Sequence, residues 1–408
     1  MSKNKKLISK NTKIENKSFI ASMLPVLFGV FVVYLIIGIA LPAIPLHVNK
    51  DLGFGSFMVG MVAGAQFAAT FISRFWSGHF ADKQGGKKTI IVGMIVAAIS
   101  GLFYIASLFF TGNQMFSAII LLIGRGILGG AESFIISGAL LWGLSIGGKE
   151  NAGKVIAWVG TAMYIAFAAG APLGSLIYNY SGFTGIAVLT TIVPIATIFF
   201  LLPRHSIATK PAAQQSIKKV INAVWIPGVG LAFSSLGFGA IMTFIILLFS
   251  NKGWEFGWLA LTLFAMSFVI VRVVWGHLPD RIGGAKIALI FAIVETLGLF
   301  FIGYASSPLY AFIGAILTGL GYSLVYPGLG VEVVKNTPDE SSGLAMGAYS
   351  AFLDLALGIA NPSLGYIADA FGMSKIYIIS AIIVMLSALI SAYLLKNRKV
   401  TFSKNRRY

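Results

Sequence analysis

Two residues of opposite charge lie inside one long apolar stretch of the sequence. Arg125 and Glu132 stand seven residues apart in the run 116–146, so on a helix they share a face, nearly two turns apart. A buried arginine is tolerated only beside a partner or water. If both face a wet cavity, Glu132 can take up and release protons, while Arg125 tunes its proton affinity or binds an anionic group. The alternative is a static ion pair that stabilises packing.

Further polar groups interrupt other apolar runs. Asp354 lies near the middle of the run 342–368 and Glu295 midway along 287–305. Asp354 is a candidate for proton coupling, or for pairing with a cation elsewhere. Glu295 either contacts a neighbouring helix or reaches a ligand. Gln66 and Asn361 are neutral candidates for ligand contact, because polar groups inside apolar helices are costly and often functional.

Several other chemistries are not indicated. The chain has no cysteine, which excludes disulfides and thiolate metal sites. Its four histidines lack metal-ligand spacing. The segment from Gly143 to Lys149 imitates a phosphate-binding loop, but Glu150 occupies the position of the required Ser or Thr. We therefore expect no metal, no cofactor, no ATP hydrolysis and no enzymatic activity.

The elements that position these residues are set by composition. Hydrophobic residues make up 57% of the 408 residues and charged residues only 11%, against roughly 25% in a soluble domain. The chain therefore lacks a charged surface, and lipid must be its main solvent. The net charge of +17 resides at the termini and between apolar runs. We expect no nucleic-acid partner, because no basic stripe interleaves with aromatic residues.

Apolar stretches of about 20 residues predict twelve membrane-spanning helices. They cover residues 20–46, 57–81, 89–110, 116–146, 155–180, 185–203, 224–250, 257–279, 287–305, 308–334, 342–368 and 374–395. The first run is too long for a signal-peptide core and is expected to be retained. The predicted organisation is a tail 1–19, a six-helix bundle 20–203, a linker 204–223, a second six-helix bundle 224–396 and a tail 397–408.

The distribution of Lys and Arg predicts the orientation. With both termini on one side, that side holds 24 of the 30 basic residues, the other side three, and the spans three. Because basic loops stay in the cytoplasm, both termini and the linker are predicted to be cytoplasmic. The expected location is the bacterial plasma (inner) membrane, with multiple crossings.

An internal repeat follows the second and the eighth predicted spans. Seven residues recur at one offset of 198 residues, the separation of Arg74 from Arg272. The matched pairs are Arg74 and Arg272, Gly78 and Gly276, His79 and His277, Asp82 and Asp280, Gly85 and Gly283, Gly86 and Gly284, and Lys88 and Lys286. Such repetition between halves is typical of secondary transporters, whose substrate site lies between the repeats.

These residues resemble the signature loop of the major facilitator superfamily, and the resemblance covers the whole chain. Arg125 to Gly129 resembles the motif of proton-coupled members that holds an arginine inside the membrane. Gly170 to Gly174 resembles the Gly-Pro motif of antiporters, although Ala171 stands before Pro172. The chain looks most like a bacterial subgroup of sugar or drug efflux permeases. The resemblance implies two pseudo-symmetric bundles of six helices.

The resemblance also implies a gate at the repeated loops. Asp82 and Asp280 would accept hydrogen bonds from neighbouring helix N-termini when the cavity opens outward, and release them as it opens inward. The bland alternative is that these charges only orient the chain. The gating set is Arg74, Gly78, Asp82, Lys83, Gly85, Lys88, Arg272, Gly276, Asp280, Arg281, Gly283 and Lys286, with Glu332 in a similar network.

In that fold, a set of mostly aromatic residues lies on the helices that line the cavity. The predicted substrate contacts are Tyr34, Gln66, Arg125, Trp158, Tyr164, Phe238, Glu295, Tyr322, Tyr326 and Asn361. Any single aromatic residue can equally serve packing alone. The third helix of each triplet is usually peripheral in this family, which favours a structural role for Glu295.

We therefore expect a monomeric, proton-coupled carrier of a small organic molecule, with efflux favoured over uptake. Its partners would be substrate, protons and lipid. The alternatives are an uptake symporter for a sugar or organic anion, and a sensor or scaffold that keeps the fold without transporting. A channel is disfavoured, because a duplicated gate has no purpose in a permanently open pore.

Overall fold

The protein is helical throughout the part of the chain that the structure describes. This computed structural model describes residues 2–148, 151–204, 217–337 and 342–405, so much of the predicted linker and the last three residues lie outside it. The helices before the linker are α1 (Ser2–Leu46), the π-helix η1 (His47–Asp51), α2 (Ser56–Gln84), α3 (Gly86–Leu108), α4 (Gln114–Gly147) and α5 (Ala152–Leu201). Those after it are α6 (Ile217–Asn251), α7 (Gly257–Trp275), α8 (Leu278–Ile282), α9 (Gly284–Gly303), α10 (Pro308–Lys335), α11 (Ser342–Phe371) and α12 (Met373–Asn405).

The predicted twelve membrane crossings are confirmed, because α5 crosses the membrane twice. Within the described residues, 11 helices are long and apolar enough to span a bilayer. α5 has 50 residues, which at 1.5 Å per residue exceed twice the hydrocarbon thickness of about 30 Å. Gly182 breaks it with φ 60° and ψ −156°, outside the helical region. α5 therefore makes two crossings joined at Gly182.

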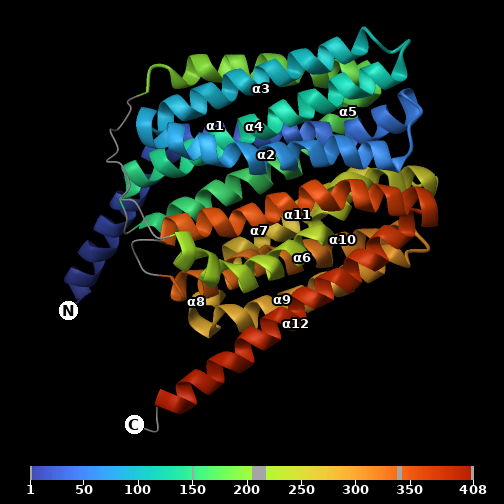
Figure 1. The fold of residues 1–408 in the computed structure, drawn as a ribbon. Helices are drawn as coiled ribbons and strands as arrows, with labels where there is room; N and C mark the ends of the chain where they lie inside the picture. Colours follow the sequence, from blue (N-terminus) through green and yellow to red (C-terminus); the bar gives the residue numbers. More distant parts are fainter. Residues whose placement is uncertain (1, 149–150, 205–216, 338–341, 406–408) are drawn as a thin grey trace.

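The helices form two layers that follow the order of the chain. Figure 1 shows α1–α5, coloured blue to green, on one side and α6–α12, coloured yellow-green to red, on the other, with both termini at the same end of the molecule. The layers meet through α2 against α11 and α5 against α7. We call α1–α5 the first half and α6–α12 the second half.

Small residues let the helices approach closely, as expected in lipid. Gly170 of α5 packs on Gly38 of α1, where an added Cβ would lie 2.7 Å from the Gly38 carbonyl carbon. Gly174 packs on Ile39, with its Cβ position 2.0 Å from the Ile39 carbonyl oxygen. The Gly-Pro segment therefore serves here to join α5 to α1.

The terminal helices are longer than predicted. α1 begins at Ser2 and α12 ends at Asn405, so helix continues through most of both segments that the sequence assigned to tails. Hydrophobic runs marked the spans, but helix propensity does not end where hydrophobicity ends. The predicted division into domains otherwise stays a proposal.

Candidate functional site

A cavity lies between the two halves. It encloses about 810 Å³ of space, its open side included. α1, α2, α4 and α5 line it from the first half, and α6, α10 and α11 from the second. All three residues predicted to couple protons, Arg125, Glu132 and Asp354, lie on its wall. Most of the remaining wall is apolar.

Glu132 is held on this wall by neutral donors. The hydroxyl of Tyr34 donates to its Oε1 and the amide of Gln66 donates to its Oε2, each at 2.7 Å. Glu132 is only 9% exposed and forms no ion pair with another described residue. The carboxylate is therefore satisfied by hydrogen bonds from neutral groups and has no opposite charge bound to it among the described residues.

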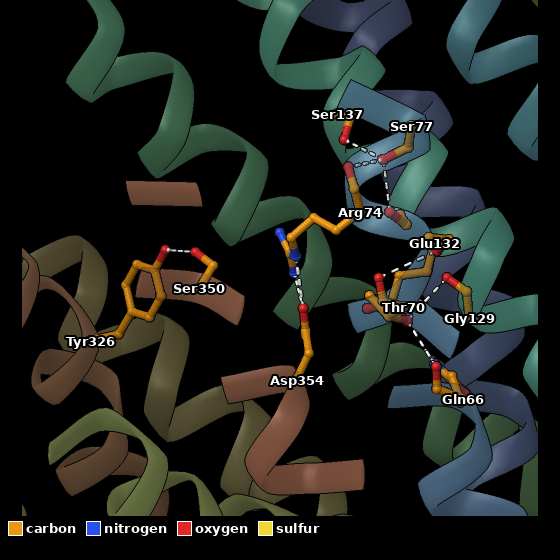
Figure 2. A network of polar contacts seen from close by, with 12 residues as sticks. Gln66, Thr70, Arg74, Ser77, Gly129, Glu132, Ser137, Tyr326, Ser350 and Asp354 are labelled. Atoms are coloured by element: carbon orange, nitrogen blue, oxygen red, sulfur yellow. Dashed lines mark hydrogen bonds and ion pairs between the residues drawn. The ribbon is translucent and has the colours of Figure 1, made fainter. Parts of the chain in front are cut away.

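The close crossing of α2 and α4 brings Gln66 to Glu132. A Cβ on Gly129 would lie 1.9 Å from the Gln66 carbonyl oxygen, so only glycine fits there. The Thr70 hydroxyl lies 2.9 Å and 3.0 Å from the carbonyl oxygens of Gln66 and Gly129, and Figure 2 shows it between the two helices. Gly129 thus sets the spacing that allows the Gln66–Glu132 bond.

Arg125 lies on the same wall but is not paired with Glu132. Its Nη1 reaches the Tyr104 hydroxyl at 3.5 Å, a long hydrogen bond, and its Nε has no partner among the described residues. Arg125 is 4% exposed. The static ion pair considered from the sequence is therefore not formed in this structure.

An ion pair joins the two halves beside the cavity. Arg74 of α2 donates through Nε to Asp354 Oδ2 at 2.8 Å, and its Nη2 also contacts that oxygen. The two side chains are 28% and 5% exposed. Figure 2 shows the pair bridging α2 and α11. The sequence had indicated both residues but not that they pair.

Aromatic rings cover the part of the cavity between α5, α6 and α10. Tyr164 lies 6.4 Å from Phe238, and Phe238 stacks on Tyr322 at 5.2 Å, measured between ring centroids. Phe268 of α7 stacks behind Tyr164 at 3.4 Å. We call Tyr164, Phe238 and Tyr322 the aromatic wall. It offers a mostly apolar, aromatic surface to a bound molecule.

Six of the ten predicted substrate contacts line the cavity, and four lie elsewhere. Those on the wall are Tyr34, Gln66, Arg125, Tyr164, Phe238 and Tyr322. Trp158 is 40% exposed on α5, and Tyr326 bonds Ser350 at 2.6 Å. Asn361 accepts a bond from Thr243 at 3.2 Å. These three residues are not among those that line the cavity in this conformation, and their contact with substrate stays a prediction.

Glu295 is the fourth residue away from the cavity. It is fully buried in α9, and its Oε2 accepts a 2.6 Å hydrogen bond from Ser234 of α6. A Cβ on Gly237 would lie 2.5 Å from its Oε1, so the carboxylate occupies the space beside a glycine. Its placement agrees with the structural interpretation of this residue.

The comparisons with known proteins come from sequence and from fold. The sequence matches the Major Facilitator Superfamily over residues 26–259 and 228–407, which together cover most of the chain. The chain belongs to the major facilitator superfamily. It is 38% identical over 368 residues to the "Uncharacterized MFS-type transporter YhhS" of Escherichia coli (strain K12), covering 90% of this chain and 91% of that protein.

Two solved structures share the fold of this major facilitator protein. A point mutant of the nucleoside transporter NupG aligns with a TM-score of 0.73 at 15% identity, covering 91% of this chain and 99% of that one. The human organic anion transporter MFSD10 aligns with a TM-score of 0.69 at 14% identity, covering 91% and 98%. At such identities the likeness concerns the fold alone. The protein is thus a multi-pass membrane transporter with the major facilitator fold.

The signature loops of this major facilitator protein are not engaged across the halves. Asp82 and Asp280 are exposed and form no hydrogen bond or ion pair with another described residue. Arg272, the repeat partner of Arg74, donates to the Ser323 carbonyl at 2.9 Å within its own half. Glu332 accepts from the Ala285 amide at 3.0 Å and so caps α9. The predicted gate contacts are absent from the described residues in this conformation.

The halves instead make contact at the end away from the termini. Asp369 of α11 accepts hydrogen bonds from the backbone amides of Ser56 and Phe57, at 2.7 Å and 2.8 Å, and so caps the N-terminus of α2. A Cβ on Gly60 would lie 2.2 Å from the Asn361 carbonyl oxygen. One on Gly365 would lie 2.3 Å from the Ser56 carbonyl oxygen. No pattern in the sequence indicated this capping contact.

A polar cluster at the same end was also missed. His47 Nδ1 lies 2.8 Å from Asp51 Oδ2, and Tyr178 donates to the same oxygen at 2.8 Å. His47 stacks on Phe183 at 4.2 Å. All four residues belong to the first half, so the cluster fastens η1 to α5. The only signal in the sequence was a histidine four residues before an aspartate.

Proposed function

We propose that this transporter is proton-coupled and moves a small organic molecule by alternating access. The observation that supports this most is Glu132, a buried carboxylate without an opposite charge, on the wall of a cavity shared by both halves. Ionisable groups inside membrane proteins often mark proton pathways. Glu132 carries the proton, and Tyr34 and Gln66 hold its charged form between transport steps.

The Arg74–Asp354 ion pair stabilises the conformation in which the two halves are in contact at α2 and α11. Because it joins α2 to α11 beside the cavity, it stretches or breaks when α2 and α11 move apart there. A proton on Asp354, or an anionic group near Arg74, weakens it. Binding of a proton or an anion in the cavity can thereby shift the equilibrium from one conformation of the halves to the other.

Alternating access is supported by the unequal contacts at the two ends. The end away from the termini is joined by the Asp369 cap and by glycine packing. At the other end, Asp82 and Asp280 have no partner among the described residues. We propose that the termini are cytoplasmic in a bacterial plasma membrane, as the basic residues indicate, so this conformation is closed to the outside.

The direction of transport is a separate part of the proposal. The sequence favoured efflux, and efflux stays a prediction. A coupled uptake symporter is the second candidate, and the charges of the cavity favour it. Arg74 and Asp354 neutralise each other, as do Arg125 and Glu132 formally. A bound anion therefore adds one negative charge to the cavity, and a proton on Glu132 balances it. An anion and a proton would accordingly move together.

Proteoliposomes loaded with a pH-sensitive dye test the function. We expect that some compound from a panel of small organic acids, sugars and amines moves protons in the wild type. Glu132→Gln should abolish this signal. Glu295→Gln is the matched control, because Glu295 is also buried and bonded to a neutral donor but is not among the residues that line the cavity. If proton coupling is undiminished in Glu132→Gln, Glu132 is not the proton carrier. If no compound moves protons in the wild type, a sensor or scaffold is favoured.

A further inference from the structure

The polar groups of the cavity are few and unevenly partnered. Four charged residues belong to it or border it: Arg74, Arg125, Glu132 and Asp354. Arg74 and Asp354 bind each other, and Glu132 accepts two hydrogen bonds. Arg125 alone has no strong partner among the described residues, since its one contact is a 3.5 Å bond to Tyr104.

Burying the Arg125 guanidinium without a strong hydrogen-bond acceptor costs free energy. Arg125 is 4% exposed, and its Nε is buried without an acceptor. A guanidinium in such a site gains most from a planar anion, because its parallel N–H groups match the two oxygens of a carboxylate. Glu132 does not supply this anion to Arg125. It lies nearly two turns further along α4, about 10.5 Å in helix rise, and it accepts hydrogen bonds from other donors.

The aromatic wall limits the body of the ligand. Tyr164, Phe238 and Tyr322 form a continuous series of rings, with centroid separations of 6.4 Å and 5.2 Å. Met163 and Met242 extend the apolar surface beside them. A sugar would need hydrogen-bond partners around its whole ring, and this side of the cavity offers few. An aromatic or aliphatic body gains from burial against these side chains.

We infer that the cavity selects a small organic anion with an apolar or aromatic body. Its acid group binds Arg125 and its body packs against the aromatic wall. The inference deepens the proposed function and rests on it for transport, although binding can be tested alone. Binding of the anion favours protonation of Glu132, because the anion and the proton together leave the net charge of the cavity unchanged.

The test is ligand binding to purified protein, with benzoate, phenylacetate and hexanoate as probes. Benzamide and benzylamine replace the acid of benzoate with a neutral and a cationic group, and gluconate keeps the acid without an apolar body. We expect the three carboxylates to bind more tightly than all three comparison compounds. Equal binding of benzamide or benzylamine, or no binding of any of the carboxylates, overturns the inference.

Variants locate the binding site. Loss of a charge-assisted hydrogen bond in Arg125→Gln should weaken benzoate binding about tenfold or more, and Arg125→Lys should restore part of it. Arg204→Gln is the charge-matched control, because Arg204 lies outside the cavity over the Phe200 ring. The benzoate affinity of this variant should match that of the wild type. Phe238→Ala should weaken hexanoate and benzoate alike. Unchanged benzoate affinity in folded Arg125→Gln and Arg125→Lys overturns the inference.

Transport measurements separate this inference from the proposed function. If the carboxylates bind through Arg125 but move no protons into proteoliposomes, the ligand class stands and proton coupling fails. If only neutral or cationic compounds drive proton movement, proton coupling stands and the ligand class fails.

Discussion

Asp369 offers a direct test of how the halves are held closed at the end away from the termini. Its two carboxylate oxygens accept one backbone hydrogen bond each from the first turn of α2. The substitution Asp369→Asn keeps one acceptor and removes the other together with the charge. It leaves the size of the side chain unchanged, so packing between α2 and α11 should be preserved.

The expected size of the effect follows from these contacts. A hydrogen bond to a charged group contributes about 1.5–3 kcal/mol, and a negative charge at a helix N-terminus about 0.3–1 kcal/mol. Asp369 is exposed, which places the loss at the lower end, about 1.5 kcal/mol. At 1.4 kcal/mol per factor of ten, the conformation open at that end should become about tenfold more populated.

The absence of native cysteine makes the assay specific. A single cysteine at Leu41, on the cavity wall, can be labelled in intact cells by a maleimide that does not cross membranes. While the open conformation is rare, the labelling rate follows its population. We expect about tenfold faster labelling in Asp369→Asn.

The control is Asp51→Asn, because Asp51 is another exposed carboxylate at the same end whose bonds stay within the first half. Its labelling rate should match that of the parent protein. An unchanged rate in Asp369→Asn, or equal acceleration in both variants, would refute the reasoning.

Two further predictions concern buried contacts. Asp354→Asn leaves Arg74 without its partner and should lower the free energy of unfolding by about 3 kcal/mol, whereas the double variant Arg74→Gln/Asp354→Asn should recover most of it. Additive losses in thermal unfolding would contradict the pairing. Gly129→Ala should destabilise the protein markedly, because the new Cβ would lie 1.9 Å from the Gln66 carbonyl oxygen. Gly130→Ala, where nothing lies within 4 Å, should melt as the wild type does.

The sequence predicted the features that depend on periodicity and charge. The span limits agree with the helices to within a few residues for α2, α3, α4 and α10, because lipid imposes length and hydrophobicity on each crossing. Arg125 and Glu132 could be placed on one face, because seven residues make nearly two turns. Their cavity-facing direction was a hypothesis based on the cost of burying charge.

Features that depend on how separate helices meet could not be predicted. Arg74 and Asp354 are 280 residues apart, and their pairing requires the rotation and tilt of both halves. Asp369 reaches α2 over 313 residues for the same reason. Tyr326 bonds Ser350 and is not among the residues that line the cavity. A helix with aromatic residues on several sides does not reveal which of them reach the cavity.

The two repeated halves have specialised. Glu132 lies on α4 and its hydrogen-bond donors on α1 and α2, while two of the three rings of the aromatic wall come from α6 and α10. Under the proposed function, the residues that couple protons and most of those that contact the body of the cargo are therefore encoded in different stretches of the gene. Laboratory evolution toward a cargo with the same acid group but a different body should accumulate changes in α6 and α10 and spare α2 and α4.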